Sequence, residues 1–598
     1  MNENQNTNTE NKMVNVSFES LIFPNKILPP CFFNSHISEN LQEIYNQYDN
    51  DKIFYDNFEW DENDECIKRF YGYKDVSTRV VKGVEPIVFT AEKPSGGSRK
   101  FSVAHPLVQI PLHKYILENV DILLSKQVDE TDDYCSNSHF FFEDGELYVE
   151  YDYNGNELIS SGLDTLLQNT YRDSLIKKHV LSKGKYYKLS SDISNFYHSI
   201  YTHTISWDVP DTEKHIFDNL DIMMRTQNNN ETKGIIIGPY SSGLFAELLM
   251  SKVDKVILKY INDNELDVSF VRFADDIEMY SDSEPALKEC LFVLENELLK
   301  YKLDINNNKT IMSEFPFLQS ITKNTKSIYQ LKDRLIDNQY IDQLEKAEDI
   351  ILEINNSIKV NYSNAKYLLN IINSLIRNKD IISDIDDVNI LNILLDYLLN
   401  IIFKYPFLIQ STALVILSLL EKSEVANIGE FITKAINKRN TKKQVVKEII
   451  DIWITYIITY FKYNDEVTDS YFKEILYKSE LSAVMIFNYY SELELLGDKK
   501  HILHPYLVFV KEDLKNKYAD NWKQASWLSK YWLLFYMNDL KWNIHNIAGY
   551  GDTILPEINI ESLTISPPLT TRLYLFLTMK NIGIKLLDYS KIDYTLNR

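Results

Sequence analysis

The sequence predicts a mixed α+β part, which carries the chemistry, followed by an all-α part. Up to about residue 320, short β-branched and aromatic runs alternate with helical stretches, and after about residue 330 one amphipathic stretch follows another. The 598 residues are enough for two to four domains of roughly 150 residues each.

Amphipathic helices are expected throughout the C-terminal half. In residues 442–463 the apolar residues recur every three or four positions, at Val446, Ile449, Ile450, Trp453, Ile457 and Phe461. Similar stretches are 341–378, 387–404, 411–422, 470–497 and 526–541. They follow no fixed repeat period, so the pattern fits an irregular α-solenoid and a plain helical bundle equally well.

Composition and charge narrow the class of protein. The chain has 63 basic and 86 acidic residues, and the acidic excess lies wholly in residues 1–350, where 58 acidic residues stand against 35 basic ones. Proteins that hold long duplexes bring Lys and Arg to the phosphates, so this half suits a long template and primer poorly.

The four scattered cysteines indicate neither a zinc module nor a disulfide framework and favour a reducing cytoplasm. The apolar stretch 390–420 contains Asp396, Lys404 and Pro406, so no membrane role is expected.

Two acidic elements form the candidate catalytic centre. Residues 185–203 are predicted to form a strand that ends at Asp192 and turns into a helix, and residues 268–281 two strands joined at Ala274-Asp275-Asp276. An Asp at a strand end or turn is more often a capping or solvated residue. Adjacent carboxylates between apolar strands repel each other, however, and a divalent cation relieves that repulsion. Two such metals about 4 Å apart can activate a 3′ hydroxyl and neutralise a leaving pyrophosphate.

Three further segments supply small or basic residues. Between the two acidic elements, Gly238-Pro239 ends a strand-like run, and small residues such as Ser242 then lead into a helix, which allows a nucleotide to approach the backbone. A Gly-rich hairpin at 92–106 and an Asn-rich turn at 303–310 carry basic side chains suited to triphosphate contacts. These are Lys93, Arg99, Lys100 and Lys309.

The order of these elements resembles that of the palm and fingers of reverse transcriptases. Over about residues 85–320, DISNFYHSIYTH corresponds to motif A, GIIIGPYSSGLFAE to motif B, FADD to motif C and LDINNNKT to motif D. The SNFYHSIYTH run and the long helical half look most like the abortive-infection (Abi, AbiK-like) reverse transcriptases of bacterial phage defence. The resemblance implies an N-terminal extension in 1–84, an α+β palm and fingers in 85–325 and an all-α, HEAT-like domain in 326–598.

The resemblance also implies roles for individual residues. Asp192, Asp275 and the backbone of Ile193 would bind Mg²⁺ or Mn²⁺, and Asp276 would be the second carboxylate of motif C. Tyr197 would exclude a ribose 2′-OH, so that dNTPs are the expected substrates. The remaining nucleotide contacts would come from Lys93, Arg99, Lys100, Gly238, Ser242 and Lys309.

Departures from the common pattern bear on the template and the primer. Templated relatives usually carry Gln before the motif B glycine, where this chain has Ile237, and Phe273 stands for the Tyr of YxDD. Abi enzymes are known for DNA synthesis without a template, primed from a tyrosine of the protein, and for closed oligomers. Here the polar segment 40–57 offers Tyr45 and Tyr48 as primers, on an element where mobility is plausible.

The leading interpretation is therefore a protein-primed, template-independent DNA polymerase of phage defence. It would act in the bacterial cytoplasm as a homo-oligomer, a trimer or hexamer, and would carry its own single-stranded DNA product. Two alternatives stay open: an RNA-templated reverse transcriptase with a cognate RNA, and a catalytically inactive helical scaffold.

Overall fold

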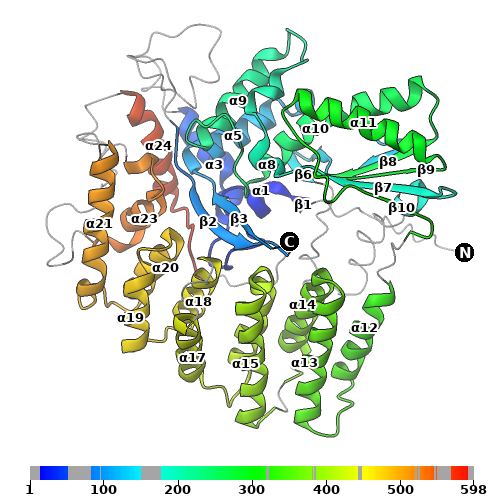
Figure 1. Ribbon diagram of the computed structural model, residues 1–598. Helices are drawn as coiled ribbons and strands as arrows, with labels where there is room; N and C mark the ends of the chain where they lie inside the picture. The colour runs from blue at the N-terminus through cyan, green and yellow to red at the C-terminus, as the bar shows by residue number, and fades with distance from the viewer. Residues whose placement is uncertain are drawn as a thin grey trace, which may run out of the picture.

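The protein is described by a computed structural model that covers residues 14–50, 83–94, 96–149, 177–317, 322–379, 381–382, 385–441, 448–518, 522, 526–544, 547 and 567–589. Figure 1 shows a mixed part of sheets and helices above a row of helices. The row curves beneath the mixed part and rises along the left of the picture. The expected order, an α+β part followed by a large helical region, is confirmed.

A five-stranded sheet forms the centre of the mixed part. In spatial order its strands are β10 (Ile311–Glu314), β7 (Tyr187–Asp192), β9 (Asp276–Ser281), β8 (Val268–Phe273) and β4 (Tyr134–Ser136). Neighbouring strands are antiparallel except for β4 and β8, which are parallel. Val268 to Arg272 are all buried, so β8 is covered on both faces.

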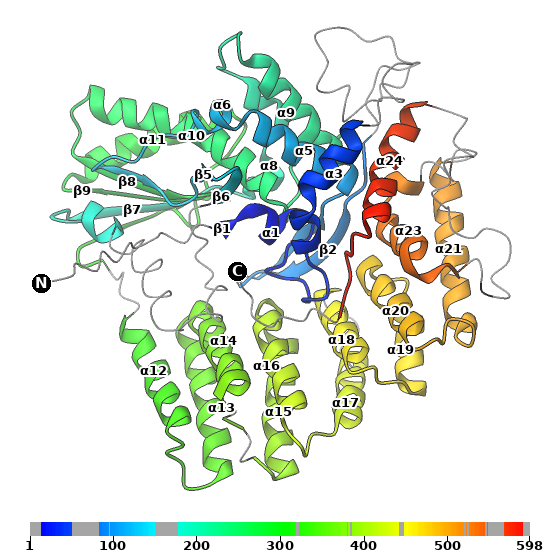
Figure 2. The same ribbon diagram turned by 180° about the vertical axis from the view of Figure 1, so that it is seen from behind.

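Two long helices lie against this sheet on one side, α10 (Tyr240–Asp263) and α11 (Glu284–Lys300), as Figure 1 and, from behind, Figure 2 show. Helix α11 begins at Ser283, whose side chain accepts a hydrogen bond from the amide of Ala286, and it buries Leu287, Leu294 and Leu298. The spacing of Leu287, Leu291, Leu294 and Leu298 in the sequence predicts a helix over 284–302, and the structure confirms it within two residues. Helix α10 starts directly after Pro239, which cannot donate a backbone hydrogen bond.

The remaining elements of this part surround the strand ends. They comprise the hairpin β2 (Ile87–Glu92) and β3 (Ser98–Val103), the sheet of β1 (Val14–Asn15), β6 (Glu146–Val149) and β5 (Phe140–Glu143), and the helices α1 (Val16–Ser20), α2 (Ser35–Glu39), α3 (Leu41–Asn50), α5 (Pro106–Glu118), α6 (Val120–Leu124), α8 (Phe196–Ser199), η3 (Thr202–Ser206) and α9 (Lys214–Gln227). The β2–β3 hairpin is the Gly-rich hairpin expected from the sequence.

The C-terminal region is built from helices in two layers. Its elements are α12 (Thr322–Ile336), α13 (Gln343–Val360), α14 (Tyr362–Lys379), α15 (Val388–Lys404), η4 (Pro406–Leu408), α16 (Ile409–Lys422), α17 (Ile428–Thr441), α18 (Glu448–Tyr460), α19 (Glu466–Ile475), α20 (Glu480–Glu492), α21 (Lys500–Tyr518), η6 (Ser526–Leu528), α23 (Trp532–Met537), η7 (Asn538–Trp542) and α24 (Pro567–Ile582). Helices α13, α15, α17 and α19 pack in succession as one layer, and α14, α16, α18 and α20 as the other.

The two layers differ in burial because they differ in sequence. In the second layer, Ile409 to Leu420 of α16 and Ile449 to Thr459 of α18 are buried without interruption. Such helices are apolar all round, as expected where a helix is enclosed on every side. The sequence pattern of 341–378 indicates one continuous amphipathic stretch. The structure divides it into two helices, α13 and α14, because the chain is extended at Asn361.

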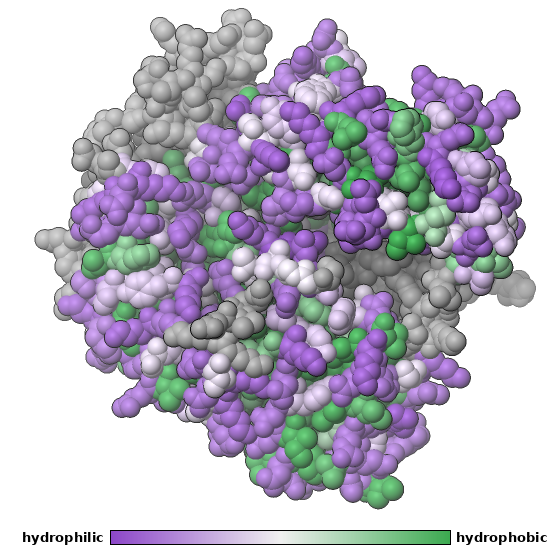
Figure 3. Space-filling view, viewed as in Figure 1, coloured by the Kyte–Doolittle hydropathy of each residue, from purple (hydrophilic) through white to green (hydrophobic). Residues whose placement is uncertain are grey.

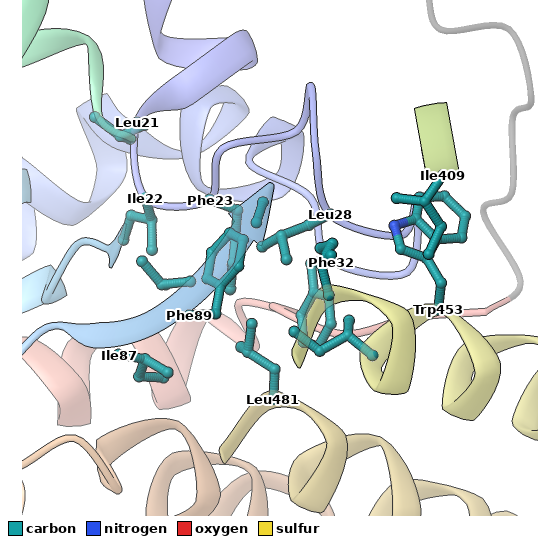
Figure 4. Close-up of a cluster of buried hydrophobic side chains, with 14 of the residues drawn as sticks. Leu21, Ile22, Phe23, Leu28, Phe32, Ile87, Phe89, Ile409, Trp453 and Leu481 are labelled. Carbon is teal, nitrogen blue, oxygen red and sulfur yellow. The ribbon is translucent and has the colours of Figure 1, made fainter. Parts of the chain in front are cut away.

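Residues 21–34 join the mixed part to the helical region. The side chain of Asn34 accepts hydrogen bonds from the amides of Ile22 and Phe23, each at 2.9 Å, and so folds this segment back on itself. Figure 4 shows Phe23, Leu28 and Phe32 of the segment between Phe89 of β2 and Trp453 of α18. Trp453 Nε1 donates to the carbonyl oxygen of Ile27 at 3.0 Å. The Gly-rich hairpin β2–β3 and the helical region therefore share one hydrophobic core.

The outer surface carries charged and apolar side chains together. Figure 3 shows hydrophobic residues gathered over the mixed part and at the lower end of the row of helices. Large exposed apolar side chains include Phe292 and Leu299 of α11 and Leu352 of α13. Within the described ranges, no single helix has the length and apolar character to cross a membrane; α15 with η4–α16 meets that test only as a pair bent by 117°.

Candidate active site

The two acidic elements predicted from the sequence meet at the centre of the sheet. Asp192 is the last residue of β7, and its Cα partner across the antiparallel ladder is Asp276, the first residue of β9. Directly opposite residues of such a pair have their side chains on the same face, about 5 Å apart at Cβ. Asp275 lies beside them, in the two-residue turn between β8 and β9. The structure therefore brings together Asp192, Asp275 and Asp276, as expected.

Backbone contacts fix the turn that carries Asp275. The amide of Ile193 donates to the carbonyl oxygen of Asp275 at 3.3 Å, which ties the end of β7 to the turn. Ala274 adopts a left-handed conformation with φ of 49°, which is uncommon for a residue with a Cβ. The position of the carboxylate thus depends on contacts that hold Ala274 in this conformation.

The electrostatics of the acidic pair favour a bound cation. Burial raises the pKa of Asp275, against the opposing effect of the cations Arg99 and Lys93. Burial and the charge of Asp275 together raise the pKa of Asp276 to about 6, although solvent reaches Asp276 and screens part of this effect. These two neighbouring carboxyl groups are difficult to ionise together, and a bound divalent cation would stabilise their ionised forms.

The Asn-rich turn lies against the end of β7. The amide of Asn306 donates to the carbonyl oxygen of Asp192 at 2.7 Å, and the amide of Ser194 donates to that of Asp304 at 2.8 Å. The ammonium group of Lys309 binds the carboxylate of Asp192 directly. Lys309, which the sequence offered as a nucleotide contact, therefore contacts one of the acids in this structure.

The basic hairpin lies near the same acids. Lys93 and Arg99 lower the pKa of Lys309, after the effect of burial, and both also act on Asp275. The tip is a turn in which the amide of Lys93 donates to the carbonyl oxygen of Gly97 at 3.0 Å, and Arg99 and Lys100 beyond it are exposed. Positive charge is thus held close to the acidic cluster, where a triphosphate would need it.

His198 is a site residue that the sequence interpretation missed. Burial lowers its pKa, and Lys93, Lys100 and Arg99 lower it further, so the imidazole lies within the field of the hairpin. It follows Tyr197 in α8, and its backbone approaches Gly234, where an added Cβ would lie 3.2 Å from the His198 carbonyl oxygen. Its adjacency to Tyr197 was the one signal available in the sequence.

Tyr197 and the motif B residues lie beside this cluster. Tyr197 is half-buried in α8, packs its ring against Phe196 with centroids 5.2 Å apart, and accepts a hydrogen bond on its carbonyl oxygen from the amide of Ile235 at 2.9 Å. This bond links motif A to motif B. Ser242 is 1% exposed in the first turn of α10, so its hydroxyl lies inside the protein rather than on a nucleotide-facing surface.

Gly238 has a specific steric role. Ile237 accepts a hydrogen bond on its carbonyl oxygen from the amide of Ser102 in β3 at 2.7 Å. The next residue, Gly238, has φ of 150°, and an added Cβ would lie 2.2 Å from the carbonyl oxygen of Ser102. Only glycine allows β3 to approach motif B this closely. The contact sets the distance between the basic hairpin and the site.

The donor set fits Mg²⁺. The described part of the chain contains no group of three or more His, Cys, Asp or Glu side chains close enough to hold a metal ion by themselves. Mg²⁺ needs less than this, because it is commonly held by one or two carboxylates together with substrate phosphates. Asp192 and Asp275 would supply the two carboxylates. Ile193 forms a bridge with Ile305 whose hydrogen bonds use the flanking residues, so neither bond occupies the Ile193 carbonyl.

Of the two expected primers, the structure describes the side chain of Tyr45 only, and that side chain is buried. Tyr45 belongs to α3, is 7% exposed and contacts Lys114 of α5, whose Nζ is 5.3 Å from the ring centroid. Within the described residues its hydroxyl has no hydrogen-bond partner. The expectation that Tyr45 lies on a mobile element is wrong, because one apolar face of α3 is buried in the core. The side chain of Tyr48 lies outside the described residues.

A buried charge network stands behind the acidic turn and was not predicted. Arg272 of β8 is fully buried and forms ion pairs with two acids of α10, Glu247 at 2.8 Å and Asp254 at 2.7 Å. The hydroxyl of Tyr134 donates to Asp254 at 2.7 Å. Arg272 keeps the pKa of Glu247 low despite its burial. The sequence showed Arg272 only as one position in an alternating strand.

Comparison with known families agrees with this arrangement. Residues 150–348 match the family described as reverse transcriptase (RNA-dependent DNA polymerase). This part of the chain is similar in sequence to a reverse transcriptase domain. The match includes Asp192 and Asp275-Asp276, so the acids that meet in the structure lie within the matched segment. No curated protein matches the chain.

Solved structures with detectable similarity to the chain include yeast telomerases. A truncated apo telomerase from Candida tropicalis has 20% identity and a TM-score of 0.19 over 25% of this chain, and the chain spans about a third (34%) of its length. Apo telomerase from Candida tropicalis has 15% identity and a TM-score of 0.27, with 69% of this chain and 73% of that one covered. Telomerase from Candida albicans with a fragment of telomeric RNA has 13% identity and a TM-score of 0.25, with 61% and 64% covered. Overlap at these scores transfers no property of telomerase to this chain.

Proposed function

We propose that the protein is a DNA polymerase of the reverse transcriptase type that builds DNA from dNTPs with Mg²⁺ or Mn²⁺. The observation that carries this proposal is the register of β7 and β9, which sets Asp192 opposite Asp276 with Asp275 alongside. Basic side chains of a separate hairpin act electrostatically on Asp275 and Asp276. Acids that can bind a divalent cation, next to a basic hairpin that can bind phosphates, are the combination that nucleotidyl transfer requires.

The residues of the site would divide the work as follows. Asp192, Asp275 and the Ile193 carbonyl would hold the cation, which when bound activates the attacking hydroxyl and stabilises the leaving pyrophosphate. Arg99, Lys93 and Lys100 would bind the triphosphate and offset its charge.

Lys309 and Tyr197 would have separate tasks. Lys309, which binds Asp192 in this structure, would be released toward the phosphates once a cation replaces it at that carboxylate. Tyr197 would lie against the sugar and exclude a 2′-OH.

The proposal extends to synthesis without a template. Ile237 occupies the position where templated relatives usually carry Gln, and its carbonyl is bound to Ser102 of the hairpin. A branched apolar side chain offers no hydrogen bond to a base pair. The acidic excess of residues 1–350 also disfavours the hold on a long duplex.

Priming by the protein itself is part of the proposal, with Tyr48 as the predicted residue. Tyr45 suits this role poorly, because its hydroxyl would have to leave the core to reach Asp192. Peptide mapping after reaction with a labelled dNTP should place the nucleotide on Tyr48, and Tyr48→Phe should stop initiation while leaving extension of an added DNA primer intact. A label elsewhere would remove Tyr48 from the mechanism without affecting the assignment of the acids.

Abortive infection is the proposed biological role, and a homo-oligomer, a trimer or hexamer, the proposed working form. The support is the resemblance of the motif A run to the Abi group, together with the helical region. Its two-layered succession of helix pairs is the arrangement that a HEAT-like solenoid would have. Expression of the protein and of its Asp275→Asn variant in phage-challenged bacteria tests this role, since protection should require the acid.

One assay separates the candidate functions. Purified protein is incubated with labelled dNTPs and Mg²⁺, either without nucleic acid or with an RNA template and a DNA primer, and the products are resolved under denaturing conditions. Labelled protein in the absence of nucleic acid supports the proposal. Labelled DNA only in the presence of RNA and primer supports an RNA-templated reverse transcriptase, and no label in either condition supports an inactive scaffold.

A further inference from the structure

The loop after β4 reaches the acidic turn from behind. Ser138, two residues beyond the end of β4, accepts a hydrogen bond on its hydroxyl oxygen from the amide of Ala274 at 3.2 Å. Ala274 is the left-handed residue directly before Asp275. The hydroxyl of Ser138 therefore contacts the residue directly before a proposed cation ligand, although Ser138 belongs to the loop that follows an edge strand of the sheet.

The hydroxyl of Ser138 has its full complement of hydrogen bonds. It donates to Glu247 Oε2 at 2.6 Å and accepts from Arg272 Nη1 at 3.3 Å as well as from Ala274. A serine hydroxyl has one proton to donate and two lone pairs. Because the one O–H of Ser138 donates to Glu247, both lone pairs are available to accept from Arg272 Nη1 and from the Ala274 amide. The rotation of the hydroxyl is thereby fixed.

The charged partners are fixed in turn. Arg272 Nη1 and Nη2 contact the two carboxylate oxygens of Glu247, each at 2.8 Å, and Nη1 also donates to the carbonyl oxygen of Ala274 at 3.3 Å. Both peptide groups that flank the Ala274 Cα are thus held, one by Ser138 at the amide and the other by Arg272 at the carbonyl oxygen. These contacts come from the loop after β4, from β8 and from α10.

We propose that Ser138 is a positioning residue for nucleotidyl transfer: supported by Glu247 and Arg272, it holds Ala274 in its left-handed conformation and so sets the position of the Asp275 carboxylate. The proposal rests on the proposed function of the site. Misplacement of a reacting group by about 1 Å can cost about 100-fold in rate. An uncommon backbone conformation beside a catalytic acid therefore needs such an anchor.

Ser136 provides a matched control. Its hydroxyl donates to the other oxygen of the same carboxylate, Glu247 Oε1, at 3.0 Å, and lies 3.2 Å from the hydroxyl of Ser138. Among the interactions found within the described residues, it makes no contact with Ala274. Ser136→Ala and Ser138→Ala each remove one hydroxyl from Glu247, but only the second removes the anchor of the turn.

The test combines hydrogen exchange with kinetics on the full-length protein. Exchange is followed by mass spectrometry on a peptide that spans residues 270–280, and dNTP incorporation by steady-state rates at several Mg²⁺ concentrations. We expect Ser138→Ala to speed exchange at the turn and to lower kcat by about 10- to 100-fold, with little change in the KM for dNTP because the basic hairpin is untouched. The Mg²⁺ concentration for half-maximal rate should rise, while Ser136→Ala should behave as wild type.

Each other outcome overturns a defined part of the inference. Faster exchange with an unchanged kcat would show that the turn is anchored but that its position does not limit the reaction. Equal losses in Ser136→Ala and Ser138→Ala would assign the effect to the Glu247 pocket in general. If wild type incorporates no nucleotide, the proposed function fails, whereas exchange alone still decides whether Ser138 anchors the turn. Should Ser138→Ala not fold, Ser138→Cys, with its weaker hydrogen-bonding thiol, takes its place in the same comparison.

Discussion

Asp192, the last residue of β7, lies directly opposite Asp276, the first residue of β9. Within the same ladder, the amide of Ile193 binds the carbonyl oxygen of Asp275. Two acids that are distant in the sequence are thereby fixed by backbone register rather than by flexible loops. A site built on strands keeps its geometry when a side chain is replaced, so substitutions there should report on chemistry more than on folding.

Replacement of Asp275 should abolish activity without unfolding the protein. Asp275→Asn removes a cation ligand, and we expect incorporation to fall by about 100-fold or more. Because burial raises the pKa of this carboxyl, the charged form is disfavoured in the folded state, and the neutral amide should leave the melting temperature unchanged or raise it. Single-turnover rates and thermal unfolding of the same preparation check both points. Wild-type rates in the variant would refute the role of Asp275.

Replacement of Tyr197 should relax sugar selectivity. Tyr197→Ala removes the ring from α8, and we expect the preference for dNTP over rNTP in kcat/KM to fall by about 10- to 100-fold. Tyr197→Phe is the control, since it keeps the ring and removes only the hydroxyl, and its selectivity should match wild type. If Tyr197→Ala discriminates between the sugars as well as the parent does, the side chain is a packing residue only.

A methyl group at Gly238 should separate the hairpin from motif B. The added Cβ would meet the Ser102 carbonyl oxygen at 2.2 Å, and the backbone conformation alone should cost about 1–3 kcal/mol in the free energy of unfolding. Gly243→Ala is the matched control, because its Cβ would meet only Phe140 at an ordinary 3.6 Å and the residue lies in helix α10. Chemical denaturation of both variants tests this. Equal stability would mean that β3 moves away from motif B at little cost.

The stability of the junction between hairpin and helical region should depend on pH through Glu448. This residue begins α18, accepts a hydrogen bond from the amide of Thr90 in β2 at 3.2 Å, and has a pKa raised to about 8 by burial and by Glu480. The folded protein therefore binds this proton more tightly than the unfolded chain, so its contribution to stability is present at low pH and is lost as the pH rises from about 4.5 to about 8.

The variant Glu448→Gln keeps an acceptor for Thr90 and carries no charge. Its melting temperature should exceed that of wild type above pH 8 and converge with it near pH 5. Thermal unfolding across this range provides the measurement. A constant difference between the two proteins at all pH values would show that Glu448 does not titrate in this window.

Local patterns predicted the elements that carry the acids. The alternation before Asp192 and around Asp275 predicted the strands, and the leucine spacing of α11 predicted a helix, because both depend only on neighbours in sequence. Register was not predictable in this way. That Asp192 pairs with Asp276, and not with a residue one position away, follows from the packing of the whole sheet.

The supporting contacts of the site escaped prediction because they are distant in sequence. Arg272 reads as one polar position in a strand, and only the fold reveals that Glu247 and Asp254 reach it from α10. Tyr45 was misjudged for a related reason. Its segment is polar on average, yet Ile44 and Tyr45 face the core, and that face is visible only once α3 is placed.

The most direct test of the central claim is the intact mass of the purified protein after incubation with dNTPs and Mg²⁺ in the absence of nucleic acid. The account predicts that wild type gains mass in steps of one nucleotide, and that Asp275→Asn under the same conditions gains none. A wild-type protein that gains no mass and extends no primer on an RNA template, or a variant that gains mass as wild type does, would contradict the assignment of Asp192, Asp275 and Asp276 as a polymerase site.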